Sequence, residues 1–256
     1  MSYKKKSLGQ HFLINDGVCQ SIVDGLIVDE TIKKKVIEIG PGGGALTKHL
    51  IKKNIDLWLV ELDDRFAPKL PMQFPTLSKK VIHQDILKID WYENFGEEYS
   101  IFGNFPYNIS NLILFKIFEN HLNVTQMVGM FQKEVAQRVS SPPGNKTYGK
   151  ISVLLQTYYI VEYLFDVDAK EFMPPPKITS GVVRLTRKDK LPVIADLKKY
   201  TTLVKLGFGQ RRKKLSNSLK SYSFNKTSRI EMLMDKRPEQ CNFEDFIYLY
   251  EQISTD

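Results

Sequence analysis

The segment Val36-Ile37-Glu38-Ile39-Gly40-Pro41-Gly42-Gly43-Gly44-Ala45-Leu46-Thr47 decides the fold. Its first four residues are mostly β-branched and apolar, which indicates a buried strand, and the glycines after them indicate a tight turn into a helix. Because glycine has no side chain, a ligand can approach the backbone of such a turn closely. The segment therefore predicts a strand–turn–helix unit with a ligand-binding turn.

Strands and helices continue to alternate along the first two-thirds of the chain, which predicts a doubly wound α/β sheet. The expected strands are residues 35–39, 55–62, 81–84, 99–103, 124–131, 162–167 and 180–185, the last of them antiparallel. The expected helices between them are 45–53, 110–120, 133–140 and 150–158. After residue 187 the alternation stops, and helical spacing continues at 195–206, 213–222, 229–234 and 243–253. We therefore expect an α/β domain over residues 1–188 and a small all-helical domain over 189–256.

Composition indicates a globular protein with a polyanionic partner. Hydrophobic residues make up 42% and charged residues 26% of the chain, and the net charge is +8. Residues 186–220 contain eleven Lys and Arg against two Asp, so the positive excess lies mainly in the expected helical domain. Four of these cations are consecutive, Arg211-Arg212-Lys213-Lys214, a run that exceeds what solubility needs and favours contact with phosphates.

The remaining composition argues against several classes of protein. Cys19 and Cys241 are far apart and neither belongs to a CxxC pair, so we expect no disulfide framework, no zinc site and a reducing cytoplasm. No apolar segment follows the basic start Met1–Lys6, and no apolar run approaches the roughly 18 residues of a membrane span. We therefore expect no signal peptide and no membrane partner.

Acidic residues follow the glycine turn at the ends of the next two strands. Glu61 lies 21 positions after Gly40, where a carboxylate can accept both hydroxyls of a ribose. Asp85 ends the third strand and could accept an adenine amino group, or it could instead cap a helix. Since the carboxyl ends of parallel strands meet at one edge of the sheet, these residues predict an adenosine-bearing cofactor.

The glycine spacing helps to choose between adenosine cofactors. Dinucleotide-binding turns have the spacing Gly-x-Gly-x-x-Gly, whereas this turn reads Gly40-x-Gly42-x-Gly44 and contains Pro41. There is also no Walker lysine to hold a phosphate. The pattern favours S-adenosylmethionine over a dinucleotide, although the glycines alone leave the dinucleotide as an alternative.

The stretch Asn104-Phe105-Pro106-Tyr107 contains the groups needed to methylate an amine on a planar ring. Such an amine is a poor nucleophile because its lone pair is delocalised into the ring. An Asn side-chain oxygen and the carbonyl of Phe105 can accept its two N–H groups and draw the lone pair out of conjugation. Pro106 restricts the backbone to an extended turn, and Tyr107 offers a face on which a base can stack.

With these residues the chain resembles the small-subunit rRNA adenine dimethyltransferases, the kasugamycin-sensitivity family. Five segments carry the resemblance over nearly the whole chain: Gly9-Gln10-His11-Phe12-Leu13, residues 38–47, residues 104–107, Phe172-Met173-Pro174-Pro175-Pro176-Lys177, and residues 208–217 around the basic run. The glycine motif is common to many methyltransferases, but the N-terminal and basic motifs together are specific. The family more often has leucine at the position of Phe105, and its chemistry uses only the carbonyl there.

The resemblance implies a Rossmann-like class I methyltransferase with a helical C-terminal domain. It implies S-adenosylmethionine as cofactor, S-adenosylhomocysteine as product, and no metal. The implied reaction is N6,N6-dimethylation of two adjacent adenines near the 3′ end of 16S rRNA, in the small ribosomal subunit or its precursor, with a role in subunit maturation. We expect a cytoplasmic monomer, since nothing in the sequence demands a dimer.

The resemblance also assigns residues to roles. The residues matching His11 and Leu13 touch the cofactor, and we group with them Gly40, Gly42, Glu61, Asp85 and Asn104. Asn104, Phe105, Pro106 and Tyr107 are the expected catalytic residues, and Phe172 is a candidate for the second stacking face, with a packed core position as the alternative. Arg211, Arg212, Lys213 and Lys214 are expected to bind RNA, with Lys4–Lys6 as a flexible arm.

Four other functions compete with this prediction. The macrolide-resistance 23S rRNA methyltransferases share the catalytic core, but the basic motif favours the small-subunit enzyme. DNA adenine methyltransferases usually have proline at the position of Phe105. A ribosome-assembly factor that mainly binds immature subunits, and a nicotinamide dehydrogenase, are the alternatives from other classes.

Overall fold

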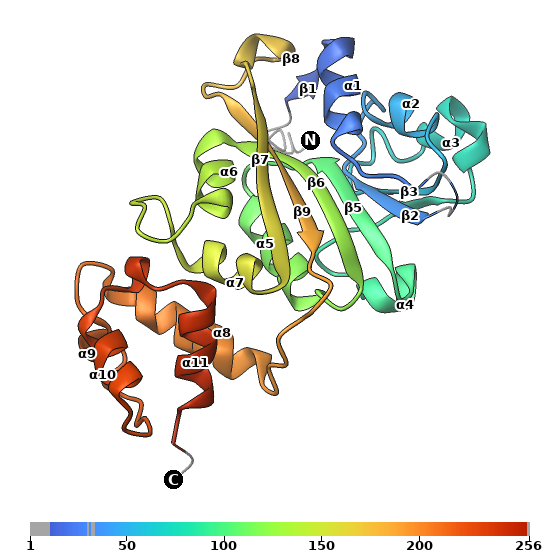
Figure 1. Ribbon diagram of the computed structural model, residues 1–256. Helices are drawn as coiled ribbons and strands as arrows, with labels where there is room; N and C mark the ends of the chain where they lie inside the picture. The colour runs from blue at the N-terminus through green and yellow to red at the C-terminus, as the bar shows by residue number, and fades with distance from the viewer. Residues whose placement is uncertain (1–10, 30, 32–33, 255–256) are drawn as a thin grey trace, which may run out of the picture. The chain divides into compact units, whose positions relative to one another are not determined.

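The computed structural model describes residues 11–29, 31 and 34–254 (Figure 1). The strands are β1 Phe12–Leu13, β2 Lys34–Ile39, β3 Ile55–Glu61, β4 Val81–His83, β5 Tyr99–Asn104, β6 Val124–Gln132, β7 Tyr159–Val167, β8 Phe172–Met173 and β9 Ser180–Arg187. The helices are α1 Asp16–Asp24, α2 Thr47–Leu50, α3 Leu70–Gln73, α4 Trp91–Phe95, α5 Ser110–Glu119, α6 Lys133–Ser140, α7 Lys150–Tyr158, α8 Leu197–Gly207, α9 Leu215–Ser218, α10 Ser228–Asp235 and α11 Phe243–Glu251. Short 3₁₀ helices lie at Pro75–Leu77, Ala169–Glu171, Phe208–Gln210 and Pro238–Gln240.

The chain divides into two compact units. Unit 1 runs to Ala136 and resumes over Glu162–Arg187, and unit 2 contains Gln137–Val161 and the residues from Lys188 on. The divisions at residues 136 and 161 fall within α6 and β7.

A seven-stranded sheet in the order β4-β3-β2-β5-β6-β9-β7 forms the centre of unit 1. Strands β2 to β6 pair in parallel, and β9 is antiparallel to β6. From β2 the chain adds β3 and β4 on one side and then returns to add β5 and β6 on the other. The strand order therefore reverses between β2 and β5, which is where open α/β sheets bind ligands.

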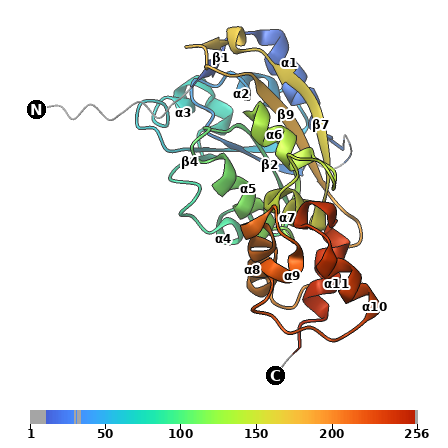
Figure 2. The ribbon, with the colours of Figure 1, turned by 90° about the vertical axis from the view of Figure 1, so that its left-hand side faces the viewer.

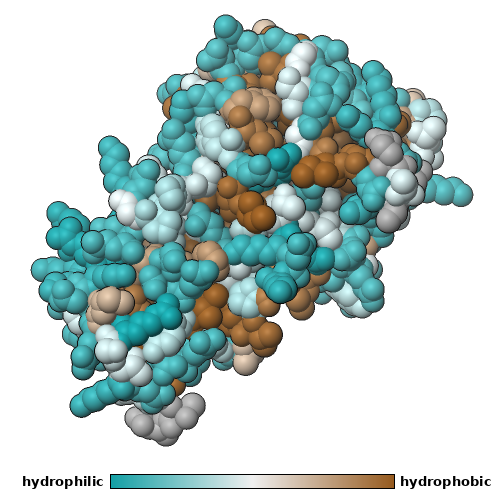
Figure 3. All heavy atoms as spheres, in the orientation of Figure 1, coloured by the Kyte–Doolittle hydropathy of each residue, from teal (hydrophilic) through white to brown (hydrophobic). Residues whose placement is uncertain are grey.

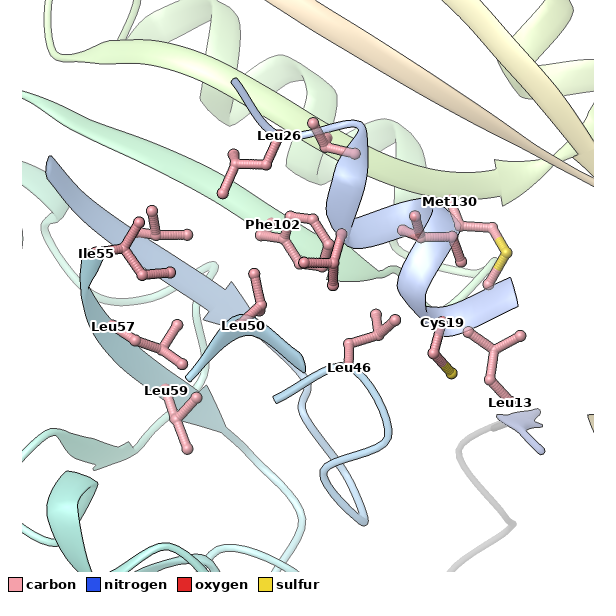
Figure 4. Close-up of a cluster of buried hydrophobic side chains, with 14 of the residues drawn as sticks. Leu13, Cys19, Leu26, Leu46, Leu50, Ile55, Leu57, Leu59, Phe102 and Met130 are labelled. Atoms are coloured by element: carbon pink, nitrogen blue, oxygen red, sulfur yellow. The ribbon is translucent and has the colours of Figure 1, made fainter. Parts of the chain in front are cut away.

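Helices cover both faces of this sheet (Figure 2). Because strand residues alternate between faces, Phe102 joins a core cluster with Ile22 of α1 and Leu50 of α2. Tyr99, three positions earlier in β5, contacts the ring of Phe95 in α4 on the opposite face. Figure 4 shows side chains of this cluster from β3, β5, β6 and the adjoining helices lying between α1, α2 and the sheet. Burial on both faces fixes the strand ends that surround the site described below.

Unit 2 is a helical cluster in which α7, α8 and α11 pack together. Tyr200 of α8 and Phe246 of α11 are fully buried, and the Tyr200 hydroxyl is hydrogen-bonded to Thr157 Oγ1 of α7 at 2.9 Å. On the face seen in Figure 3, the side chains of these C-terminal helices are mostly hydrophilic. A hydrophilic surface fits the concentration of charge in this part of the sequence.

The expected strands are all present, with bounds within three residues of the prediction, and β9 is antiparallel as predicted. Two expected helices are much shorter than predicted: residues 45–53 reduce to α2, and 213–222 reduce to α9. The start of α9 is fixed by the Leu215 N–H, which donates to the Lys236 carbonyl at 2.8 Å. Thr227 caps α10, and Asn242 caps α11. Helix α1 had no counterpart in the sequence prediction.

The units differ from the two expected domains. The expected range 1–188 includes residues 137–161, which in the structure belong with the C-terminal helices because α7 packs against α8 and α11. Only the later division, between Arg187 and Lys188, lies next to the expected boundary at 188/189. In the sequence, the alternation of strands and helices continues through α7. It therefore gave no indication that residues 137–161 belong to unit 2.

Candidate active site

A cavity of about 510 Å³ opens at the carboxyl ends of β2, β3, β4 and β5. Its volume lies within the range of roughly 300–1,000 Å³ that is usual for small-molecule sites. All the expected cofactor residues line it, namely His11, Leu13, Gly40, Gly42, Glu61, Asp85 and Asn104. Phe105, Pro106 and Tyr107 line it as well. The structure thus brings together residues that are spread over almost 100 positions of the sequence.

The glycine turn requires glycine for two reasons. Gly40 and Gly42 have φ values of 67° and 53°, in the left-handed region that L-residues with side chains rarely adopt. A Cβ at Gly40 would meet nothing within 4 Å, so the space beside this backbone is open toward a ligand. A Cβ at Gly42 would approach the Phe12 ring to 3.1 Å. The turn therefore reverses the chain direction and also leaves space in the cavity wall for a ligand to approach the backbone.

Glu61 connects the end of β3 to the glycine turn. The side chain is 3% exposed, and its carboxylate accepts the N–H of Gly42 and the N–H of Asp63, both at 2.8 Å. Each oxygen holds one backbone donor and keeps a second acceptor site, since a carboxylate can accept about four hydrogen bonds. The group is therefore held in place and can still accept two ligand hydroxyls.

A second acid, Glu38, also lines the cavity and was not among the expected site residues. It is 1% exposed in β2, and Thr47 Oγ1 donates to it at 2.7 Å. Burial disfavours the charged form and raises the pKa of Glu38 to about 8, with Glu61 adding to the effect. The sequence did contain a signal for this residue, because Glu38 is an acid in a strand that is otherwise apolar. Burying a charge there is energetically unfavourable, and acids in such positions are often functional.

Asp85 is half-buried and its Oδ1 accepts the Leu87 N–H at 3.0 Å. This bond caps the turn over residues 86–89, so the capping alternative holds for a turn and not for a helix. Within the described residues, Oδ2 forms no hydrogen bond, and it can accept one from a ligand in the cavity.

The amide of Asn104 has a defined orientation. Its Nδ2 donates to the main-chain carbonyl of His11 at 3.0 Å, and a carbonyl can only accept, so the nitrogen must be on that side. The His11 ring is held in turn, because its Nδ1 lies 2.8 Å from the carbonyl of Pro174 and must carry a proton to donate. Oδ1 of Asn104 accepts no hydrogen bond from the described residues, so it remains as an acceptor at the cavity.

Phe105 uses its side chain and its backbone differently. The ring is buried and lies 5.1 Å from the ring of Phe131, over Gly129, where an added Cβ would come within 2.2 Å of it. The Phe105 N–H continues the ladder to the Met130 carbonyl at 3.2 Å. Its own carbonyl accepts no hydrogen bond from the described residues, which leaves a second acceptor beside Asn104.

Tyr107 lies in the turn that follows, between β5 and α5, and is half-buried. Its ring centroid is 5.7 Å from that of His11, and its hydroxyl is 2.7 Å from Ser180 Oγ. Burial raises the pKa of Tyr107, so the hydroxyl stays protonated at neutral pH. The Pro106 carbonyl accepts from the Ile109 N–H and from Ser110 Oγ, at 3.1 and 3.2 Å, which fixes the turn to the start of α5.

Phe172 does not line the cavity, which corrects the expectation of a second stacking face. The side chain is 2% exposed and belongs to the core cluster of unit 1, and the residue pairs with Leu13 where β8 meets β1. The sequence analysis left a packed core position as the alternative for Phe172, and this position agrees with that alternative. The same segment acts through its backbone instead, since Pro174 accepts the hydrogen bond from His11.

The expected RNA-binding residues lie in unit 2, between the 3₁₀ turn at 208–210 and α9. Arg211 donates to the Asn145 carbonyl at 3.3 Å, and Lys214 forms an ion pair with Asp235. Arg212 and Lys213 are exposed, and no side-chain bond or ion pair joins either one to the part of the chain that the structure describes. The other two sequence predictions near the N-terminus, Gly9-Gln10 and Lys4–Lys6, lie outside the described residues.

Comparison with known proteins identifies the family. The chain matches the family described as ribosomal RNA adenine dimethylase over residues 1–254. It belongs to this family. The ribosomal RNA small subunit methyltransferase A of Cytophaga hutchinsonii is 45% identical over 251 residues, which cover 98% of this chain and 97% of that protein. The protein of the same name from Flavobacterium johnsoniae is 43% identical over 255 residues, with 98% and 96% covered.

Two solved structures share the fold of this dimethylase. A dimethyladenosine transferase from Plasmodium falciparum has a TM-score of 0.76 at 23% identity, covering 93% of this chain and 96% of the other. The 23S rRNA methyltransferase ErmE has a TM-score of 0.70 at 24% identity, covering 94% and 99%. At these identities the likeness concerns the fold alone, and it confirms the Rossmann-like class I methyltransferase fold with a helical C-terminal domain.

Family membership confirms the enzyme class predicted from the motifs: the protein is an rRNA adenine dimethyltransferase, and such enzymes depend on S-adenosylmethionine. Within residues 11–29, 31 and 34–254, no helix is long and apolar enough to cross a membrane. The same residues contain no group of three or more His, Cys, Asp or Glu that could hold a metal ion. Cys19 and Cys241 are free and buried, and burial raises the pKa of both thiols, to about 11 and about 12.

Proposed function

We propose that this dimethylase converts two adjacent adenines near the 3′ end of 16S rRNA to N6,N6-dimethyladenosine, with S-adenosylmethionine as methyl donor. The substrate is the small ribosomal subunit or its precursor, and the modification contributes to subunit maturation. The observation that carries the proposal is the Asn104 amide, whose oxygen is left as an acceptor in the same cavity as the glycine turn. Relatives named for the small subunit, at 43–45% identity over nearly the whole chain, support the choice of substrate.

The residues of the cavity fit S-adenosylmethionine. Gly40 leaves open space where a side chain would stand, Glu61 can accept two ribose hydroxyls, and Asp85 can accept an adenine amino group. Leu13 and His11 supply part of the wall. When bound, S-adenosylmethionine supplies a methyl group on a positively charged sulfur, and transfer leaves the neutral thioether S-adenosylhomocysteine. Transfer of this kind depends mainly on proximity and in-line orientation, which a shaped cavity provides.

Asn104 and Phe105 prepare the target amine for attack. Oδ1 of Asn104 would accept one N6–H and the Phe105 carbonyl the other, and neither oxygen has another partner among the described residues. Held in this way, the nitrogen lone pair would be drawn out of conjugation with the adenine ring and could form a bond to the methyl carbon as the carbon–sulfur bond breaks. The methylated nitrogen would then release one N6 proton to water. Both acceptors are fixed before substrate arrives, so little reorganisation is needed at the moment of transfer.

Tyr107 supplies the face on which the adenine stacks. The target base must leave its own stack to enter the cavity, which costs a few kcal/mol, and stacking on an aromatic ring returns roughly 1–3 kcal/mol. Pro106 shapes the turn that carries this ring, since its carbonyl is tied to the start of α5. The core position of Phe172 leaves Tyr107 as the stacking residue that we propose.

The exposed cations of unit 2 would bind the RNA backbone. Arg212 and Lys213 are the first candidates because the described residues leave them without ion pairs, with Arg211 and Lys214 beside them. Phosphate contacts of this kind are largely independent of sequence and weaken with salt. We accordingly assign methyl transfer to unit 1 and RNA binding to unit 2, in a cytoplasmic monomer.

Methylation of 23S rRNA is the nearest alternative and is less well supported. The likeness to ErmE is one of fold at 24% identity, whereas the relatives at 45% identity are named for the small subunit. A mainly structural role in subunit assembly would leave the acceptor pair of Asn104 and Phe105 without a purpose.

The test incubates the protein with labelled S-adenosylmethionine and, separately, unmethylated small subunits, large subunits and naked DNA, and then identifies the methylated nucleoside. We expect N6,N6-dimethyladenosine from small subunits alone, and none with an Asn104→Ala variant that still binds them. Label in large subunits would move the assignment to the 23S enzymes. Donor binding without any transfer would favour the assembly-factor alternative.

A further inference from the structure

Ser180 is a buried polar residue that neither the motifs nor the cavity lining assigns to the site. It begins β9, its side chain has no exposed surface, and it does not line the cavity. Among the described residues its hydroxyl has a single hydrogen-bond partner, the hydroxyl of Tyr107 at 2.7 Å. A buried hydroxyl without that partner would be costly, so the two groups are matched.

The backbone around Ser180 is rigid. The residue pairs with Gln132 in the β6–β9 ladder, and the preceding Thr179 carbonyl accepts the Lys133 N–H at 3.0 Å. At the following residue, Gly181, an added Cβ would come within 2.5 Å of the Tyr163 hydroxyl and 2.8 Å of the Ala136 Cβ, so neighbouring side chains pack directly against this backbone. Ser180 therefore offers an anchor that is fixed by the sheet.

Tyr107, by contrast, lies in a turn and is only half-buried. A half-buried ring in a turn can change its side-chain torsions unless another contact opposes it. The hydroxyl contributes little to the stacking face, because phenylalanine presents the same ring. Its contact with Ser180, 73 positions later in the chain, opposes a change in the direction of the ring axis, because such a change would move the hydroxyl away from its partner.

We propose that Ser180 is a positioning residue for methyl transfer, which holds the Tyr107 hydroxyl and so keeps the ring axis in one direction beside the target adenine. The inference rests on the proposed function, since it concerns the base that stacks on Tyr107. Ser180 does not touch the base, and it acts only through Tyr107.

The experiment is a double-mutant cycle in the full-length protein with Ser180→Ala, Tyr107→Phe and the double variant, each assayed on unmethylated small subunits. Loss of one net hydrogen bond corresponds to a fall in kcat of about 3- to 10-fold, while KM for subunits and for S-adenosylmethionine should stay within about twofold. Because both single variants break the same contact, the double variant should be no slower than either one.

Unit 2 contains a matched control. The Tyr200 hydroxyl and Thr157 Oγ1 form a buried pair of the same chemistry at 2.9 Å, and neither residue lines the cavity. Thr157→Ala should lower the unfolding temperature with no change in kcat. A similar loss of kcat in this control would mean that the assay reports general destabilisation, which would overturn the proposal.

Stability separates positioning from folding. Tyr107→Phe leaves the buried Ser180 hydroxyl without a partner, whereas Ser180→Ala leaves only the hydroxyl of half-buried Tyr107, so the first variant should have the lower unfolding temperature. Equal losses of kcat at unequal stability support positioning. Unchanged kcat in Ser180→Ala, or losses that multiply in the double variant, would overturn it. A wild-type protein inactive on small subunits would instead refute the proposed function itself.

Discussion

Asn104 combines a committed donor with an available acceptor in one side chain. The committed donor is Nδ2, held by the His11 carbonyl, and the acceptor is Oδ1 at the cavity. A carboxylate of the same shape would have no hydrogen to give and would repel the carbonyl. The position is therefore sensitive to a change of a single atom.

We expect Asn104→Asp to lower kcat by about 100-fold or more while small-subunit binding persists, because fixed groups at the reacting centre contribute on that scale. Methyl transfer and filter binding on the same samples measure both quantities. Asn120→Asp is the matched control, since Asn120 Nδ2 also donates to a backbone carbonyl, that of Lys116 at 2.8 Å, but outside the cavity. Comparable activity loss in the control would contradict the assignment.

Glu38 makes the stability of the enzyme depend on pH. Its pKa is raised to about 8 by burial, so between about pH 4.5 and 8 the folded state holds a proton that the unfolded state has released. The contribution of Glu38 to the free energy of unfolding is therefore highest below about pH 4.5 and decreases as the pH rises toward 8. Glu38→Gln should remove a slope of up to about 1.4 kcal/mol per pH unit across that interval. Urea unfolding of both proteins from pH 5 to 9 measures the difference, and parallel curves would refute the buried proton.

At the scale of elements, the short pair β1–β8 holds the N-terminal wall of the cavity. Leu13 pairs with Phe172 and Phe12 with Met173, which places the cavity residues His11 and Leu13 beside the segment that ends in Pro174. Two-residue strands contribute few ladder bonds, so the buried side chains of Leu13 and Phe172 must supply most of the stability of this contact.

Phe172 should behave as a core residue. We expect Phe172→Ala to cost about 3–5 kcal/mol of unfolding free energy, as truncation of a buried Phe does, and Phe172→Leu to cost less. Because the ring does not face the cavity, Phe172→Leu should keep its kcat at temperatures where it is folded. A large fall in kcat with little loss of stability would restore the stacking role for this ring.

Strand β6 makes room for the Phe105 ring through the absence of a side chain at Gly129. The Phe105 ring lies over Gly129, and a Cβ there would come within 2.2 Å of it. Gly129→Ala should displace the ring, cost about 1–3 kcal/mol and move the adjoining carbonyl, with at least a tenfold loss of activity. Gly209→Ala, where an added Cβ meets nothing within 4 Å, is the control. Full activity in Gly129→Ala would show that the ring can move without disturbing the acceptor pair.

For the whole molecule, charge is distributed unevenly along the chain. The excess lies in residues 186–220, and Arg212 and Lys213 are the cations of the basic run that the described residues leave exposed and unpaired. When the cations that bind RNA phosphates belong to a different part of the chain from the residues that hold the reacting amine, they can raise the affinity for RNA without adding positive charge at that amine.

Replacing Arg212 and Lys213 together by Gln should weaken small-subunit binding and reduce the slope of log affinity against log salt by about 1–2, because two phosphate contacts are lost. The rate of transfer at saturating subunits should change little. A charge-matched control replaces the exposed Lys198 and Lys226, also in unit 2. An unchanged slope in the first variant, or an equal change in the control, would remove the basic run from the interface.

The sequence by itself determined the alternating fold, the glycine turn, and a set of polar residues at successive strand ends, because periodicity and turn chemistry are local and strand ends in a parallel sheet converge. It also placed Asn104, Glu61 and Asp85 at the cavity. Its helix bounds were least reliable near α2 and α9, where tertiary hydrogen bonds such as that of Leu215 to Lys236 set the ends.

Only the tertiary structure decided what each side chain does once it is there. The orientation of the Asn104 amide depends on His11, 93 positions away, and the Tyr107 ring depends on Ser180, 73 positions away. The burial of Phe172 and the assignment of α7 to unit 2 likewise depend on elements remote in sequence. Local patterns specify residue types and periodicity, whereas orientation, burial and protonation follow from partners that only the folded chain brings within reach.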